Sequence, residues 1–175
     1  NSIEFYLNVD LNQQKHTKMN TIQANGYPIH FNENAYLELN SFLLENKYSN
    51  IFIFADSDTN EHCLPVFLPS LETDLTIEII EFEPGEENKN IETCVELWNV
   101  LTELKGDRKS LVINVGGGVV TDLGGFVAST FKRGIDFIHV PTTLLAMVDA
   151  SVGGKNGVDL GNLKNQIGVI NVPKM

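Results

Sequence analysis

The sequence predicts an α/β fold in which a parallel sheet is flanked by helices. Short, wholly apolar runs alternate along the chain with longer segments whose apolar residues recur at helical spacing. Runs of the first kind are typical of strands buried on both faces of a parallel sheet, and segments of the second kind are typical of amphipathic helices. Their alternation favours right-handed β–α–β connections within one sheet. The length of 175 residues suits one domain and is too short for two ordinary ones.

The first half of the chain is expected to contribute an extended piece, a helix and two strands. Residues 28–31 are expected to be extended, and residues 33–45 carry leucines at helical spacing, which predicts a helix. Residues 51–55 are entirely apolar and predict the first buried strand. A second strand is predicted over residues 76–82, and the Pro-Gly pair shortly after it is expected to break it.

The second half continues the alternation. A helix is predicted over residues 90–104, where large apolar residues share one face. A third strand is predicted over residues 111–115, a helix over residues 119–131 and a fourth strand over residues 137–140. Pro141 is expected to end that strand.

Three consecutive glycines, residues 116–118, join the third strand directly to the next helix. Glycine allows an anion to approach the backbone closely and allows a positive φ, and the start of a helix offers free N–H groups. We therefore interpret the turn as a binding site for a diphosphate. A tight turn without a ligand is the alternative. Asp122, expected in the first turn, either favours the helix dipole or accepts hydrogen bonds from a ligand hydroxyl. Gly124 and Gly125 inside the helix predict close packing against it.

Polar residues follow the predicted strands at their carboxyl ends, where ligands bind in doubly wound sheets. Taken singly, each is typical of a turn, a helix cap or a solvated charge, and only their common placement favours a ligand site. The three pairs are Asp58 with Asn60, Glu86 with Lys89, and Thr142 with Thr143.

Residues 149–165 are dense in small and polar residues, and composition alone favours a flexible surface loop. Lys155, beside a Gly-Gly pair, is placed to meet a phosphate or a carboxylate, and Lys164 repeats a cation next to an amide. Arg133 taken alone is typical of a surface arginine. His139 lies within a predicted strand and is interpreted as a packed core residue.

Composition excludes several classes of protein. The net charge of −11 disfavours nucleic-acid binding, because an acidic surface repels a phosphate backbone. No apolar run is long enough to cross a membrane, and no signal peptide is recognised. Cys63 and Cys94 are interpreted as reduced thiols of a cytoplasmic protein, with one redox pair left open. The histidines and cysteines show no ligand spacing, so no metal site is expected in this chain.

The two ends of the chain carry expectations of their own. Residues 1–18 are polar and are expected to be a leader or a poorly defined extension, with Met19 as a candidate start. The alternative is an N-terminal strand in which Ile3, Phe5 and Leu7 share a face. Residues 19–175 are expected to form one α/β domain that is truncated at its C-terminal end.

Several short motifs follow one another from the first strand to the end of the chain. They are DTN at 58–60, GEENK at 85–89, GGGVVTDL at 116–123, RG at 133–134, VPTTLLA at 140–146, VDASVGGK at 148–155 and KN at 164–165. In this order they resemble the 3-dehydroquinate synthase family of sugar phosphate cyclases. The sequence departs from the family's P-L-G-K-N string at residues 161–165, where the turn before the Lys-Asn pair differs.

The resemblance implies an enzyme, a carbon–oxygen lyase of the shikimate pathway, which converts 3-deoxy-D-arabino-heptulosonate 7-phosphate to 3-dehydroquinate and phosphate. It implies NAD as cofactor and a divalent metal, zinc or cobalt. It also implies that this chain is the Rossmann-like NAD-binding half, without the helical C-terminal domain that holds the metal, and that the chain alone is inactive. The full-length family member is usually a cytoplasmic homodimer, without nucleic-acid or membrane partners.

The resemblance also carries residue roles. The substrate, a phosphorylated sugar acid, would meet Arg133, Asp149, Lys155 and Asn165. The adenosine end of NAD would meet Asp58, Asn60, Glu86 and Lys89. The pyrophosphate would lie among Gly117, Gly118, Val119 and Asp122. The cofactor site would also include Thr142, Thr143, Lys155 and Lys164.

Three other interpretations remain open from the sequence. A related cyclase acting on another sugar phosphate would share these motifs. A metal-dependent glycerol or alcohol dehydrogenase would share the nucleotide-binding architecture, but it would consume NAD stoichiometrically. A stand-alone nucleotide-binding module, or a domain that binds nothing, would be non-catalytic.

Overall fold

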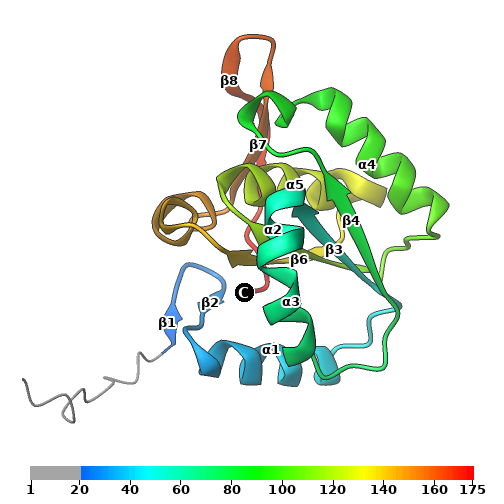
Figure 1. Ribbon diagram of the computed structural model, residues 1–175, viewed down its shortest axis with the longest axis vertical. Coiled ribbons are helices and arrows are strands. Elements are labelled where there is room, and N and C mark those ends of the chain that lie inside the picture. The colour runs from blue at the N-terminus through cyan, green and yellow to red at the C-terminus, as the bar shows by residue number, and fades with distance from the viewer. Residues whose placement is uncertain (1–20) are drawn as a thin grey trace, which may run out of the picture.

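The computed structural model describes residues 21–175. The expected leader at residues 1–18, Met19 as a candidate start and the alternative N-terminal strand lie outside the described residues. The described part contains an α/β unit built around one parallel sheet (Figure 1).

The sheet has four parallel strands in the order β4-β3-β5-β6, which confirms the predicted parallel α/β fold. The strands are β3 (Ile51–Asp56), β4 (Ile77–Phe82), β5 (Leu111–Gly116) and β6 (Asp136–Pro141). Every residue of β5 is buried, as expected for a central strand covered on both faces. All four strands coincide with the predicted segments to within a residue or two.

Helices cover both faces of the sheet and bury two separate cores. On one face, α4 (Ile91–Glu103) and α5 (Gly118–Thr130) pack on Phe52 and Phe54 of β3. On the other face, α1 (Glu33–Glu45) and α3 (Leu64–Phe67) pack on the alternate residues Ile51 and Ile53. This division follows from the alternation of side chains along a strand, and it explains why residues 51–55 of β3 are all apolar.

The remaining elements are short connections. They are β1 (Ile22–Gln23), β2 (Pro28–Ile29), α2 (Ser57–His62), η1 (Leu68–Ser70), η2 (Glu86–Asn88), η3 (Phe131–Arg133) and the π-helical turn η4 (Ala146–Ala150). Strands β1 and β2 pair antiparallel as a small hairpin. No helix within residues 21–175 is long and apolar enough to span a membrane.

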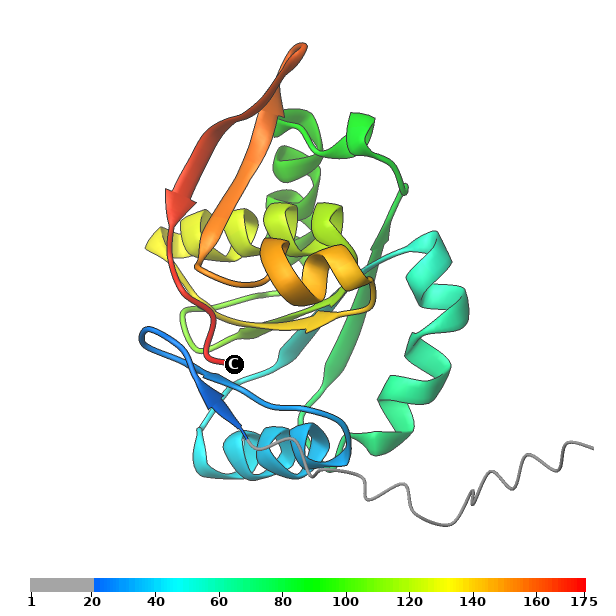
Figure 2. The same cartoon turned by 90° about the vertical axis from the view of Figure 1, so that its left-hand side faces the viewer.

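The expectation of a flexible loop over residues 149–165 is wrong. Strands β7 (Lys155–Leu160) and β8 (Leu163–Ile170) form an antiparallel hairpin, and Figure 2 shows it rising beside α5. Val158 is fully buried in the core beneath α5, and Val169 packs against the same core. The strands are therefore stabilised by tertiary packing, which the local composition of the segment does not reveal.

The glycine pair in α5 accepts a close neighbour on each side, as predicted. A side chain on Gly124 would overlap Asn114 of β5, and a side chain on Gly125 would overlap Asn156 of β7. The helix therefore lies between the sheet and the hairpin at a distance that only glycine permits. His139 is buried in β6 as predicted, and burial lowers the pKa of its imidazole to about 4.

Candidate functional site

The glycine turn brings the start of α5 to the carboxyl edge of the sheet. Within residues 21–175, no hydrogen bond is donated by the backbone N–H groups of Gly118, Val119 or Val120, and no side chain caps the helix at Gly117. Four N–H groups at a helix start have no partner within the helix, and such a start attracts anions. The turn therefore keeps the donors that a bound diphosphate requires.

The glycines of this turn serve close approach, and the expected positive φ is not found. Positive φ values occur at other glycines but at none of residues 116–118. A Cβ on Gly116 would collide with the side chain of Val120, and a Cβ on Gly117 would lie 3.2 Å from Cγ2 of Thr143. Space, rather than backbone conformation, selects glycine at these positions.

Lys89 lies at the centre of a charged cluster beside this turn. Its Nζ is 3.0 Å from Oε1 of Glu86, 3.4 Å from Oδ2 of Asp122 and 3.8 Å from Oδ1 of Asp159, and it donates to Oδ1 of Asn165 at 3.0 Å. The residue is only 4% exposed. Burial alone would lower the pKa of Lys89, but the hydrogen bond to Glu86 and the surrounding carboxylates raise it above its ordinary value.

Glu86 joins two lysines from different parts of the chain. The turn η2 places it one helical turn before Lys89, and its Oε1 is also 3.1 Å from Nζ of Lys164 on β8. Burial opposes ionisation of Glu86, yet hydrogen bonds from both lysines lower the pKa of its carboxyl below the ordinary value. Glu86 is therefore anchored, unlike its exposed neighbours Glu83 and Glu87.

Asp122 lies one turn inside α5, so the expectation that it occupies the first turn and favours the helix dipole is wrong. Burial raises the pKa of its carboxyl to about 6, although Lys89 opposes the rise. The side chain lies between the Lys89 cluster and a cavity.

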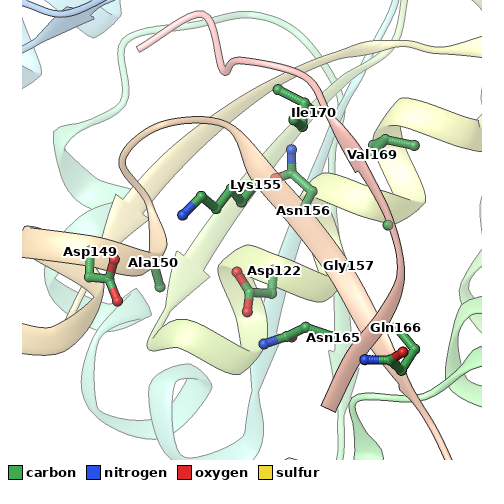
Figure 3. A pocket seen from close by; sticks show the side chains of 11 residues that line it. Asp122, Asp149, Ala150, Lys155, Asn156, Gly157, Asn165, Gln166, Val169 and Ile170 are labelled. Carbon is green, nitrogen blue, oxygen red and sulfur yellow. The ribbon is translucent and has the colours of Figure 1, made fainter. Parts of the chain in front are cut away.

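The cavity has a volume of about 520 Å³ and opens between α5, the η4 turn and the hairpin. In Figure 3 the side chains of Asp122, Asp149, Lys155 and Asn165 surround this common space from four different elements. The expected substrate residues Asp149, Lys155 and Asn165 are thus brought together with the expected cofactor residue Asp122. Lys155 is exposed, so its ammonium can reach a ligand.

The threonine pair after β6 lies at the glycine turn. The backbone N–H of Thr142 donates to the carbonyl of Gly116 at 3.0 Å, and the side chain of Thr143 lies beside Gly117. Both residues therefore border the expected pyrophosphate position. Lys164 follows the hairpin turn at Gly161, whose φ is +57°.

Three of the expected residues lie neither in the cavity nor at the Lys89 cluster or the glycine turn. Asp58 is exposed on α2, and the side-chain amide of Asn60 donates to Glu81. Arg133 is exposed and follows the C-terminal end of α5, before the start of β6. In a parallel sheet this position lies at the amino ends of the strands, opposite the glycine turn.

Sequence reasoning missed Asp159 and Asn156. Asp159 contacts the Lys89 cluster, and Asn156 lines the cavity next to Lys155. Both lie in β7, and the only signal was their position between the two Lys-containing motifs. Residues 21–175 contain no group of three or more His, Cys, Asp or Glu side chains placed to hold a metal ion. The described residues therefore do not fit a metal centre.

Fold and site together define the class: a parallel α/β domain whose ligand cavity lies at the carboxyl ends of its strands, beside a glycine-rich helix start. A family model described as 3-dehydroquinate synthase N-terminal matches residues 79–175, more than half of the chain. The chain belongs to this 3-dehydroquinate synthase family.

Relatives and solved structures support the same assignment. The chain is 43% identical over 133 residues to 3-dehydroquinate synthase of Parabacteroides distasonis, covering 75% of this chain and 37% of the relative. It is 41% identical over 153 residues to 3-dehydroquinate synthase of Campylobacter jejuni, covering 87% of this chain and 41% of the relative. The chain thus spans well under half the length of these relatives.

A crystal structure of 2-deoxy-scyllo-inosose synthase, solved with carbaglucose-6-phosphate, NAD⁺ and Co²⁺, resembles this chain with a TM-score of 0.76 and 28% sequence identity. The match covers 89% of this chain and 43% of that structure.

Proposed function

We propose that this chain is the NAD-binding part of a 3-dehydroquinate synthase. One observation carries the proposal. The cluster around Lys89, the open start of α5 and the cavity with Lys155 lie at one edge of the sheet in a member of this family. Each alone is compatible with a structural role, but their convergence supplies partners for a phosphate, for sugar hydroxyls and for an anionic substrate.

The dinucleotide would be held by backbone and charge together. N–H groups of Gly118 and Val119 would donate to the pyrophosphate, where glycine keeps side chains out of the way. The carboxylates of Glu86 and Asp122 would accept hydrogen bonds from cofactor hydroxyls, as acidic residues do in dinucleotide sites. Thr142, Thr143 and Lys164 would border the cofactor. Asp58 and Asn60 stay predictions for its adenosine end.

The substrate would occupy the cavity next to the cofactor. Lys155 would donate to a phosphate or carboxylate oxygen, Asn165 would orient the sugar, and Asp149 would accept from its hydroxyls. Arg133 stays a prediction for the substrate, because its position opposite the glycine turn does not contribute to this cavity.

The proposed reaction converts 3-deoxy-D-arabino-heptulosonate 7-phosphate to 3-dehydroquinate and phosphate, which makes the complete enzyme a carbon–oxygen lyase. NAD would accept a hydride from the substrate and later return it. The residues of this chain would bind and orient NAD and the substrate. The metal, zinc or cobalt, would be held by residues outside those described. We therefore predict no phosphate release by the 175-residue chain with NAD, zinc and substrate, and clear turnover would contradict this. The complete enzyme is proposed to be a cytoplasmic homodimer.

Titration calorimetry of the 175-residue chain with NAD tests the cofactor proposal. The wild-type chain is expected to bind NAD. Lys89→Met is expected to weaken binding about tenfold or more, because it removes the buried ammonium that holds the carboxylates of Glu86 and Asp122 in place. Lys109→Met changes an exposed lysine just before β5, at the opposite edge, and should leave affinity unchanged. Absence of NAD binding by the folded wild-type chain would refute the proposal.

A related sugar phosphate cyclase is the second candidate, because the matched 2-deoxy-scyllo-inosose synthase structure contains a hexose 6-phosphate analogue. Comparison of phosphate release from 3-deoxy-D-arabino-heptulosonate 7-phosphate and from a hexose 6-phosphate by the complete protein separates the two candidates. Net NADH accumulation would favour a dehydrogenase instead.

A further inference from the structure

We propose that Asp159 is a positioning residue that fastens the β7–β8 hairpin to Lys89 and thereby sets the shape of the ligand cavity. The proposal rests on the proposed function for its consequence in NAD binding, but the fastening itself can be measured without any ligand. Asp159 belongs to none of the motifs that carry the family resemblance.

Asp159 contacts both sides of the gap between the hairpin and the segment before α4. Its backbone N–H donates to the carbonyl of Lys89 at 2.8 Å, and a parallel bridge pairs it with Asn90. Its Oδ1 accepts from the backbone N–H of Asn165 at 2.7 Å and lies 3.8 Å from Nζ of Lys89. Asn165 in turn accepts from Lys89, so the three residues form a closed ring of contacts.

The local backbone of the hairpin is shaped around this ring. The pairing of β7 with β8 shifts register between Val158 and Leu160, which places Asp159 at a β-bulge. Bulges redirect side chains and are frequent beside active sites. Asn165 opposite has a φ of +52°, a left-handed conformation that few residues other than glycine and asparagine adopt readily. The hydrogen bond from its N–H to Asp159 stabilises that conformation and turns its side-chain oxygen toward Lys89.

The position of the hairpin decides the form of the cavity, since eight of the eleven residues that line it lie in β7 or β8. The base of the hairpin is held by Asn156 against Gly125 of α5. Farther out along the hairpin, Lys164 forms an ion pair with Glu86. The side chain of Lys164 is 69% exposed, and ion pairs this exposed contribute little to stability. The side chain of Asp159 is only 12% exposed, and it orients Asn165, which accepts from Lys89. Together with the backbone bond from Asp159 to the carbonyl of Lys89, these contacts are the stronger restraint on the outer half.

The hydrogen bond to Asn165 matters more than the charge of Asp159. The distance of 3.8 Å to Nζ of Lys89 is too long for a hydrogen bond, whereas the 2.7 Å contact to Asn165 is short. Asp159→Asn keeps an oxygen that accepts from Asn165, and Asp159→Ala removes it. A positioning role therefore predicts rescue by asparagine, whereas a purely electrostatic role predicts none.

The control is Asp107, whose Oδ1 accepts from the backbone N–H of Lys109, also at 2.7 Å. It lies in the turn before β5, at the edge opposite the cavity. Asp107→Ala removes the same kind of bond without touching the site. A further variant, Asp159→Ser, keeps a polar group at the bulge with a hydroxyl too short to reach Asn165, and it replaces Asp159→Ala if the alanine variant does not fold.

Amide hydrogen exchange by NMR on the 175-residue chain measures the bond from Asn165 to Asp159, and amide shifts of the cavity residues report the position of the hairpin. The amide of Asn165 is expected to exchange about tenfold faster in Asp159→Ala, because its acceptor is lost, and at the wild-type rate in Asp159→Asn and Asp107→Ala. Amide shifts of the cavity residues Lys155 and Gln166 should move in Asp159→Ala alone. Unchanged exchange at Asn165 or unchanged shifts in the folded variant would overturn the proposal.

Calorimetry with NAD then tests the consequence for the site. Asp159→Ala is expected to weaken NAD binding about tenfold, and Asp159→Asn to remain within about twofold of wild type. Equal affinity of wild type and Asp159→Ala would overturn the inferred control of the cavity. A wild-type chain that binds no NAD would refute the proposed function alone, since the exchange rates and amide shifts still decide whether Asp159 holds the hairpin.

Discussion

At the scale of single residues, one ammonium serves several carboxylates at the start of α5. The pKa of Lys89 is raised, because Glu86, Asp122 and Asp159 together outweigh its burial. The pKa of Asp122 is raised as well, to about 6, because burial raises it by more than the nearby charge of Lys89 lowers it. The cluster therefore stabilises the charged form of Lys89. The pKa of Asp122, in contrast, lies close to neutral pH. A ligand hydroxyl that donates to Asp122 would favour its ionised form.

The raised pKa of Asp122 makes stability depend on pH in a defined direction. Its folded-state value of about 6 lies above the ordinary value of 3.8, so its stabilising contribution is complete below pH 3.8 and is lost as pH rises through 6. Asp122→Asn should therefore stabilise the protein at pH 8 relative to wild type by about 1–3 kcal/mol, and much less at pH 4. Urea unfolding at the two pH values measures the difference.

The same substitution gives an independent test of the ligand role of Asp122. If the carboxylate accepts from a cofactor hydroxyl, wild-type affinity for NAD should rise as pH increases through about 6, and Asp122→Asn should lose that rise. A stabilised variant with unchanged NAD affinity at all pH values would show that Asp122 is structural only.

At the scale of elements, the parallel strands and the helices between them could be predicted, because a strand buried on both faces is an almost uninterrupted run of apolar residues. Residues 51–55 and 111–115 are examples, and the observed strands begin at the same residues. The hairpin contains no such apolar run. Asn156 and Gly157 are buried in β7 for reasons of packing against α5 and β8, and polar or small side chains in that role have the composition of a loop.

The site was predictable only in part for the same reason. Placement after strand ends drew attention to Glu86 and Lys89, the adjacent Gly-Gly pair drew attention to Lys155, and the family motifs added Asp149. No pattern in the sequence links Asp159 to Lys89, because the contact depends on a bulge and on a parallel bridge between segments far apart in the chain.

Gly125→Ala tests the contact between α5 and the hairpin. Alanine gains about 1 kcal/mol of helix propensity over glycine. However, its Cβ would overlap Asn156, which is held by hydrogen bonds to the carbonyls of Gly154 at 3.0 Å and Asn171 at 2.7 Å. We expect the overlap to dominate and the variant to lose about 1–3 kcal/mol of unfolding free energy.

A double-mutant cycle with Asn156→Ala provides the control. Removing the obstructing side chain should make Gly125→Ala less destabilising, or even stabilising, in the Asn156→Ala background. Additive effects in urea unfolding would mean that the two elements do not meet as closely as described.

At the scale of the whole molecule, the net charge of −11 and the proposed affinity for an anionic cofactor are compatible because the site is organised locally. Backbone N–H groups of α5, rather than a basic surface, face the expected pyrophosphate. The acidic residues beside them favour hydroxyl groups and disfavour additional phosphates. This arrangement predicts discrimination between the two nicotinamide dinucleotides.

NAD should stabilise the chain against heat much more than NADP at equal concentration. Ligand binding raises unfolding free energy by about 2.7 kcal/mol at a hundredfold excess over Kd, which is a shift of several degrees for a domain of this size. The 2′-phosphate of NADP would bring charge toward Glu86 and Asp58, neither of which can donate to it when ionised. The expected thermal shift for NADP is therefore small. Equal shifts for the two dinucleotides would place the adenosine ribose away from these carboxylates, while Lys89→Met would still report whether the cluster contributes to binding.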